Sequence, residues 1–192
     1  MGWMVRAGGT LYAPDFGNHG GSATGGLGSY TPYSGRTISA VSGTGTSADP
    51  FQVTVQNQLG ASGLASSEVV QYVNGDNFFR KQFTLTNNGA AAQTANIFLG
   101  GDIYLAGSDS GVPYRLSASG SIGGSDCGTP ASYYILYIPQ TPADAWTGSG
   151  YSSVWSQIGG GALNNALSTT SCIDNGAALQ WNRTLAAGAS VT

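Results

Sequence analysis

The sequence contains few charged residues. Asp, Glu, Lys and Arg make up 8% of its 192 residues, against about 25% in a typical soluble domain. Nine acids, six Lys plus Arg and one histidine give a net charge of −3. The sequence has no run of basic residues, so it lacks the positive surface with which proteins bind nucleic-acid phosphates. We therefore expect no nucleic-acid partner.

Long apolar runs are missing as well. No stretch approaches the roughly 18 apolar residues that a membrane-spanning helix needs, and the start lacks the two-part pattern of a signal peptide. The sequence opens on Met1-Gly2-Trp3 and stops at GASVT, within a strand-like stretch. We expect residues 1–192 to be a single domain excised from a longer exported protein, with neighbouring domains of that protein as its partners.

Motifs for nucleophilic catalysis are also lacking. Residues 107–111 read Gly-Ser-Asp-Ser-Gly, with Asp109 where a nucleophile elbow needs its serine. His19, the only histidine, lies in a Gly-rich run typical of an exposed loop. Glycosidases need two carboxyl groups that face one cleft, and spacing alone cannot pair the acids of this chain. We therefore expect a protein that is not an enzyme.

Small and β-forming residues take the place of charge. The 31 glycines, with Ser and Thr, predict turns between short strands. Strands are predicted over 10–12, 37–41, 50–59, 68–73, 77–87, 94–100, 102–106, 132–139, 177–181 and 189–192. Asn74-Gly75 between two of them is a strong hairpin signal. The pattern predicts an all-β fold, a two-sheet antiparallel β-sandwich or the larger supersandwich, with one short helix and long Gly-rich loops.

The short helix is expected in YSSVWSQIGGG. Tyr151, Val154, Trp155 and Ile158 recur at helical spacing and would form one apolar stripe, ended by Gly159. We expect this helix to cover one edge of the sandwich, with Trp155 in the core rather than in a binding site.

Two cysteines, Cys127 and Cys172, lack the partners of a zinc site. In an exported protein they are expected to form a disulfide, because disulfides persist in oxidising compartments. The alternative is two separate buried thiols. With the low charge, this favours an extracellular or cell-surface location.

Candidate binding residues combine aromatic rings with polar groups, as sugar sites do. They are Asp102, Tyr104, Asp109 and Tyr114 in one patch, and Asp174, Asn175 and Trp181 in another. The alternative for each is a role in the core or in a turn. Asp109-Ser110-Gly111 retains a fragment of a calcium loop, so Asp109 is a candidate calcium ligand, or it only caps that turn. No other cofactor is expected.

Lys81 is the only lysine, and the alternation places it with Phe79, Phe83 and Leu85 on the core face of its strand. A buried unpaired charge is costly. We therefore expect an exposed lysine near a strand end or bulge. The alternatives are that its ammonium reaches the sheet edge, or that Lys81 forms an isopeptide bond with an asparagine, with Glu68 or an aspartate as proton shuttle.

Two passages resemble known exported proteins. FTLTNNGAAAQTANI and LAAGASVT are similar to the strand–turn–strand unit and the closing strand of Ig-like cell-adhesion-related domains of bacteria. The long strand entering an Asn-rich turn resembles supersandwich modules of mutarotase-like and polysaccharide-lyase proteins. GDIYLAGSDSG, YSSVW and IDNGAALQW together resemble modules of large secreted or wall-attached bacterial proteins. The chain is nearly twice as long as an Ig-like unit, and the catalytic histidines and glutamate of mutarotases are missing.

These observations favour a non-catalytic extracellular structural, adhesion or binding module of a larger surface or secreted protein. Its ligand would be a glycan or another cell-surface molecule. The alternatives are a carbohydrate-binding module accessory to a polysaccharide-active enzyme, and a supersandwich-type carbohydrate-active enzyme domain.

Overall fold

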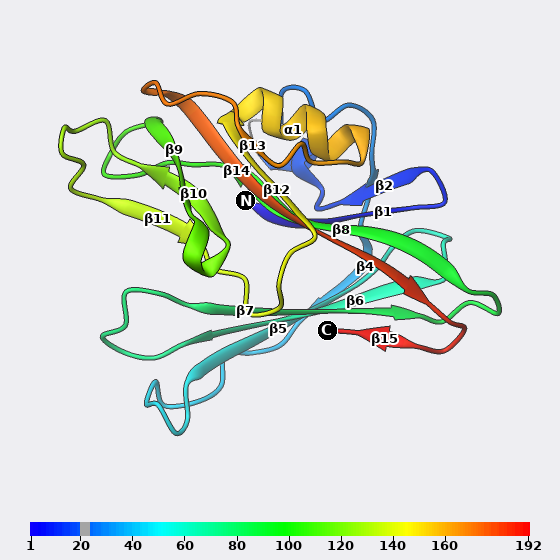
Figure 1. Ribbon diagram of the computed structural model, residues 1–192. Helices are drawn as coiled ribbons and strands as arrows, with labels where there is room; N and C mark the ends of the chain where they lie inside the picture. The colour runs from blue at the N-terminus through cyan, green and yellow to red at the C-terminus, as the bar shows by residue number, and fades with distance from the viewer. Residues whose placement is uncertain (20–23) are drawn as a thin grey trace. The chain divides into compact units, whose positions relative to one another are not determined.

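The computed structural model describes residues 1–19 and 24–192, which divide into two compact units (Figure 1). The first unit comprises Met1–Tyr30 and Ala95–Arg183, and the second comprises Thr31–Thr94 and Thr184–Thr192. The described residues form two largely antiparallel sheets and one short α-helix, so the predicted all-β fold class is confirmed. That residues 1–192 fold as a single domain stays a prediction.

The first unit is built on one large sheet. Its strands are β1 (Gly2–Ala7), β2 (Thr10–Ala13), β8 (Gln93–Asp102), β9 (Ser110–Leu116), β10 (Ser121–Ser125), β11 (Tyr134–Tyr137), β12 (Ala145–Gly150), β13 (Ala166–Leu167) and β14 (Ile173–Leu185). The main order is β11-β10-β9-β14-β8-β1-β2, and β12 pairs with both β14 and β13. Only the β12–β13 pair is parallel among the registers of these strands. Strand β14 therefore contacts β9, β8 and β12 along its length.

Helix α1 (Tyr151–Gly160) covers one face of this sheet (Figure 1). Val154, Trp155 and Ile158 of its apolar stripe are buried, and they pack with Met4 of β1 and Phe98 of β8. Gly161 ends the helix in the left-handed conformation, at φ 91°, and its N–H donates to the carbonyl oxygens of Gln157 and Ile158. The helix and its buried stripe are confirmed, although the helix extends one residue beyond Gly159.

Two short 3-10 turns complete the first unit. They are η1 (Phe16–Asn18) and η2 (Ser117–Ser119). Exposed His19 follows η1, as expected for a loop histidine.

The second unit contains the smaller sheet, in the order β15-β7-β6-β5-β4. The strands of this sheet are β4 (Ser34–Ile38), β5 (Phe51–Gln58), β6 (Leu64–Tyr72), β7 (Arg80–Asn87) and β15 (Ser190–Val191). The residues of the unit also include β3 (Thr31–Pro32), which is not part of this sheet. Strands β6 and β7 pair antiparallel from Leu64↔Asn87 to Gln71↔Arg80, so the predicted hairpin is confirmed. Residues 73–79 connect the two strands, which makes the connection longer than an Asn-Gly turn.

Asn87, at the end of β7, is fully buried and fixes several backbone segments of this unit. Its side-chain nitrogen Nδ2 donates to the carbonyl oxygens of Ala91, Leu185 and Ala186 at 2.8, 3.1 and 3.1 Å. Its Oδ1 accepts from the Gly89 N–H and from Gln93 Nε2. The amide thereby replaces hydrogen bonds that a buried loop backbone would otherwise lack.

Three details of the predicted strands were wrong. Strand β8 runs through Gly100 and Gly101 without the predicted break and ends at Asp102, so residues 103–106 are not a strand. Phe79 precedes β7 and is 51% exposed rather than in the core. The apolar run at 132–139 contributes only β11, an outer strand of its sheet, on which Tyr134 and Ile135 are exposed.

The ammonium group of Lys81 is paired with a carboxylate. Its Nζ lies 2.7 Å from Glu68 Oε1, and the two side chains are 17% and 20% exposed. Phe83 and Leu85 on the same strand are buried, as predicted. The ion pair offsets the cost of placing a half-buried ammonium on this face.

Cys127 and Cys172 form a disulfide, with Cα atoms 5.4 Å apart, so the predicted bridge is confirmed. It ties the segment after β10 to the residue before β14. Among the described residues, no helix is long and apolar enough to cross a membrane.

Candidate metal centre

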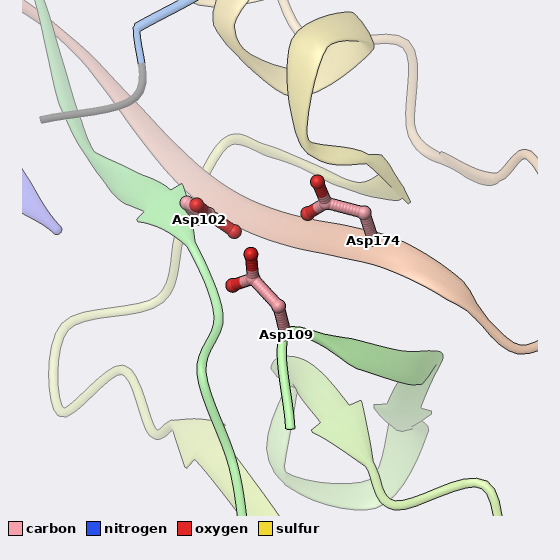
Figure 2. Close-up of side chains that lie close together, drawn as sticks. All are labelled: Asp102, Asp109 and Asp174. Atoms are coloured by element: carbon pink, nitrogen blue, oxygen red, sulfur yellow. The ribbon is translucent and has the colours of Figure 1, made fainter. Parts of the chain in front are cut away.

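Three carboxylates of the first unit converge at one place. Asp102, Asp109 and Asp174 form an aspartate cluster in which one oxygen from each residue lies within 4.8 Å of the other two. Figure 2 shows the carboxylates turned toward one another from β8, from the residue just before β9 and from β14. Asp102 and Asp174 are half-buried, whereas Asp109 is exposed.

A tight turn returns the chain from Asp102 to Asp109. Leu105 and Ser108 exchange two backbone hydrogen bonds, of 2.9 and 3.0 Å. Between them, Ala106 and Gly107 adopt positive φ values of 54° and 79°, the signature of a type I′ turn. The Ser108 hydroxyl accepts from the Ser110 N–H and donates to its carbonyl. Ser108 therefore makes the turn-capping hydrogen bonds that we predicted for Asp109.

Strand pairing brings in the third acid. Asp174 pairs with Ser110, the residue after Asp109, and the Ile103 N–H donates to the Asn175 carbonyl at 3.0 Å. Backbone contacts, rather than side-chain contacts, thus hold Asp102 and Asp109 next to Asp174.

Glycines beside the three acids let these backbones approach. A Cβ on Gly101 would lie 2.8 Å from Met1 Cα, and one on Gly176 would lie 2.8 Å from the Gly101 carbonyl oxygen. Any side chain at either position would push β8, β14 and α1 apart, and with them Asp102 and Asp174.

Partial burial and the closeness of like charges raise the pKa values of Asp102 and Asp174. Burial, then Asp174 and then Asp109 raise the pKa of Asp102 to about 6, against the opposing effects of the Ile103 N–H and the N-terminal amine. Burial and then Asp109 raise the pKa of Asp174, and a hydrogen bond with Asp102 opposes this. The cluster therefore disfavours three negative charges unless a cation balances them.

Two oxygens of the cluster lack donors. Asp102 Oδ1 and Asp174 Oδ1 are buried and have no hydrogen-bond partner among the described residues. Asn175, directly after Asp174, is fully buried, and both atoms of its amide are also unpaired. Its Oδ1 would lie 2.8 Å from a Cβ on Gly111, two residues after Asp109. Buried oxygens of this kind normally have a hydrogen bond or a cation.

The other predicted binding residues lie outside the cluster. Tyr104 is 66% exposed. Tyr114 packs edge-on against Tyr134, with ring centroids 4.9 Å apart. Trp181 is buried against Trp3, and its Nε1 donates to the Thr141 carbonyl. Trp181 is thus a core residue whose ring is closed to a ligand.

The sequence did not indicate that Tyr137 lies near the cluster, and it placed Asp174 in a different patch from Asp102 and Asp109. Burial and then Asp102 raise the pKa of Tyr137, on β11, which no local motif indicated. The sequence divided the three acids between two patches, because only the β9–β14 register unites them.

Compared with known proteins, the chain matches no family model and no curated protein. The resemblance to Ig-like and supersandwich modules therefore stays a prediction.

Proposed function

We propose that this chain is a non-catalytic structural or binding module of a larger extracellular protein, in which the aspartate cluster holds one calcium ion. The observation that carries the proposal is the convergence of three carboxylates from three separate segments, with two buried oxygens that lack donors. A bound cation would neutralise the like charges and join β8, β9 and β14.

The ligand chemistry favours calcium over other common metals. Ca²⁺ takes six to eight oxygen ligands in flexible geometry, and three carboxylates can supply up to six of them. Mg²⁺ demands a near-ideal octahedron, and Zn²⁺ prefers nitrogen and sulfur. The two cysteine sulfurs are already joined in the disulfide.

An extracellular location agrees with both features. The Cys127–Cys172 bridge ends two residues before Asp174, so it restrains the strand that carries that ligand. Disulfides persist outside the cytosol, where calcium sites with dissociation constants of about 10⁻⁴ to 10⁻³ M are useful.

A terbium experiment tests the proposal directly. Trp155 Cζ2 lies 3.3 Å from the Cβ position of Gly101, next to Asp102, so Trp155 can sensitise the emission of Tb³⁺ held in the cluster. We expect sensitised emission that calcium displaces and that is lost in the triple variant Asp102→Asn, Asp109→Asn, Asp174→Asn.

Two controls make that result specific. Asp49→Asn changes an exposed acid of the second unit and should leave the emission unchanged. Trp155→Phe should reduce emission while the calcium affinity stays the same. Equal emission from the wild type and the triple variant would contradict the proposal.

A carbohydrate-binding role has separate support in the first unit. Tyr114 and Tyr134 form a ring pair at one edge of the sheet, and Tyr133 and Tyr134 are 59% and 50% exposed. Aromatic rings of this kind offer faces for sugar rings. Neutral-glycan array binding that Tyr134→Ala abolishes is the expected result for this second candidate, and unchanged binding would exclude this ring pair.

A carbohydrate-active enzyme is the third candidate, because the cluster resembles a catalytic carboxylate pair in one respect. Retaining glycosidases hold two carboxyl groups about 5 to 5.5 Å apart, with the pKa of the acid raised. Hydrolysis of aryl glycosides or of polysaccharides, lost on Asp102→Asn, would favour this candidate over the calcium site. We expect no such hydrolysis.

A further inference from the structure

A small pocket lies in the second unit, at the end of the β6–β7 hairpin. It has a volume of about 190 Å³ and is lined by Ser47, Pro50, Gln71, Val73, Asp76, Phe78 and Arg80. We call it the Phe78 pocket. It shares no residue with the aspartate cluster, and none of these residues was a candidate in the sequence.

Backbone contacts hold the walls of this pocket. The Asn74 N–H donates to the Gly45 carbonyl at 2.8 Å, which fixes the hairpin connection against the segment before β5. Gly45 allows this approach, because a Cβ there would lie 2.5 Å from the Phe51 ring and 2.6 Å from Asn74 Nδ2. The Asp76 N–H closes a turn onto the Val73 carbonyl. The pocket is therefore formed before any ligand binds.

One wall pairs an aromatic ring with a cation. Phe78 is 48% exposed, and the Arg80 guanidinium lies 6.0 Å from the centroid of its ring. Within 1–19 and 24–192, the ion pairs are Lys81–Glu68 and Arg183–Asp144, so Arg80 has no carboxylate partner there. An exposed guanidinium next to a ring face can bind a planar anion on two nitrogens.

The adjoining part of the lining accepts hydrogen bonds, because Gln71 pairs with Arg80 in the β6–β7 register and so lies on the same face of the sheet. Gln71 Nε2 donates to Gln52 Oε1 at 2.8 Å, which fixes the amide and leaves Gln71 Oε1 free to accept. The Asp76 carboxylate adds acceptor oxygens at the same pocket. Hydroxyl groups are the donors that match such a wall.

These three features select one class of ligand. A ring face for stacking, acceptors for hydroxyl groups and one guanidinium match a sugar ring that carries a carboxylate. The volume is below the roughly 300 to 1,000 Å³ typical of whole-ligand sites, so it suits one residue of a longer chain. Asp76 beside a single arginine disfavours a phosphate dianion more than a carboxylate, because the dianion carries the larger negative charge.

We propose that the Phe78 pocket binds a uronic acid residue of an acidic glycan. Arg80 pairs with the sugar carboxylate, Phe78 stacks on the ring, and Gln71 and Asp76 accept from its hydroxyl groups. This proposal does not rest on the calcium site, which lies in the other unit.

The test titrates the whole chain with trigalacturonic acid and with glucuronic acid, followed by two-dimensional NMR. Chelator in the buffer keeps the aspartate cluster free of calcium, so the result does not depend on the function proposed above. We expect shifts at Phe78, Arg80 and their neighbours, and at least tenfold weaker binding of a neutral glucose trimer.

Variants assign the contacts. Arg80→Gln is expected to weaken binding of both uronates at least tenfold, and Phe78→Ala to weaken uronate and neutral sugar alike. Arg36→Gln removes an exposed arginine of β4 in the same unit and should have no effect. Because Phe78 is half-exposed, melting temperatures should stay within about 2 °C of the wild type.

Three outcomes would overturn the proposal. They are wild-type protein that binds neither uronate at millimolar concentration, equal affinity for neutral and acidic trimers, and unchanged uronate affinity in Arg80→Gln.

Discussion

The substitution Asp102→Asn has opposite effects on the calcium-free and the calcium-bound protein. Without calcium, burial, Asp174 and Asp109 raise the pKa of Asp102 from 3.8 to about 6. The folded state then binds more protons than the unfolded state between these two values. The free energy of unfolding therefore falls as pH rises from about 4 to about 6. At higher pH the full loss of stability persists.

The size of this cost follows from the pKa shift. At about 1.4 kcal/mol per pKa unit, a shift of this size corresponds to roughly 3 kcal/mol, and solvent screening of a half-exposed group reduces it to about 1 kcal/mol. Asparagine carries no charge, so the calcium-free variant is expected to gain about that amount at neutral pH. For a chain of this length the melting temperature should rise by about 2 to 4 °C.

With calcium bound, the wild type is expected to be more stable than Asp102→Asn. The wild type gains about 2.7 kcal/mol when calcium is at 100 times its dissociation constant, whereas Asp102→Asn lacks one ligand and gains less. Thermal unfolding followed by circular dichroism from pH 4 to 8, with chelator or with calcium, measures both effects. Asp49→Asn is the control for loss of one exposed acid. A calcium-free Asp102→Asn variant that melts below the wild type at neutral pH would show that the ionised Asp102 does not destabilise the fold.

Three further changes test the fold. Replacing Cys127 and Cys172 by serine opens a bridge between residues 45 apart, and is expected to cost about 4 kcal/mol in urea unfolding; a loss under 1 kcal/mol would contradict this. Asn87→Ala removes an amide that bonds five backbone or side-chain groups, and should cost about 3 kcal/mol by the same assay; a neutral effect would mean that water replaces the amide. Trp155→Ala should cost about 3 to 5 kcal/mol, while the exposed control Tyr104→Ala should stay within about 0.5 kcal/mol; similar losses for both would contradict the assigned core.

Local patterns in the sequence predicted the elements that depend on local residues. The stripe from Tyr151 to Ile158 gave helix α1, because one apolar face at helical spacing must be buried. The β6–β7 hairpin followed from two β-rich runs around Asn74-Gly75. The disulfide followed from two cysteines without metal partners.

Elsewhere, tertiary contacts overrode the local signal. Gly100 and Gly101 looked like a break, yet β8 continues through both, because close approach of β14 and the first residue requires glycine there. The apolar run at 132–139 predicted a longer strand, yet only Tyr134–Tyr137 pairs, at one end of its sheet. The local sequence cannot show whether a glycine pair breaks a strand or allows close packing, or how much of an apolar run will pair in a sheet.

The candidate site was predicted in its parts but not in its assembly. Asp102, Asp109 and Asp174 were all candidates, and Asp109 was the candidate calcium ligand. Their union depends on the pairing of Asp174 with Ser110, a long-range contact without a local signal. The Phe78 pocket depends in the same way on the contact between Asn74 and Gly45.

Isothermal titration of calcium into the metal-free wild type, at neutral pH and low salt, measures whether the aspartate cluster binds calcium. We expect one ion bound per chain, and no binding heat in the triple variant Asp102→Asn, Asp109→Asn, Asp174→Asn. Wild-type protein that binds no calcium, or a triple variant that binds it equally well, would show that the aspartate cluster is not a calcium site.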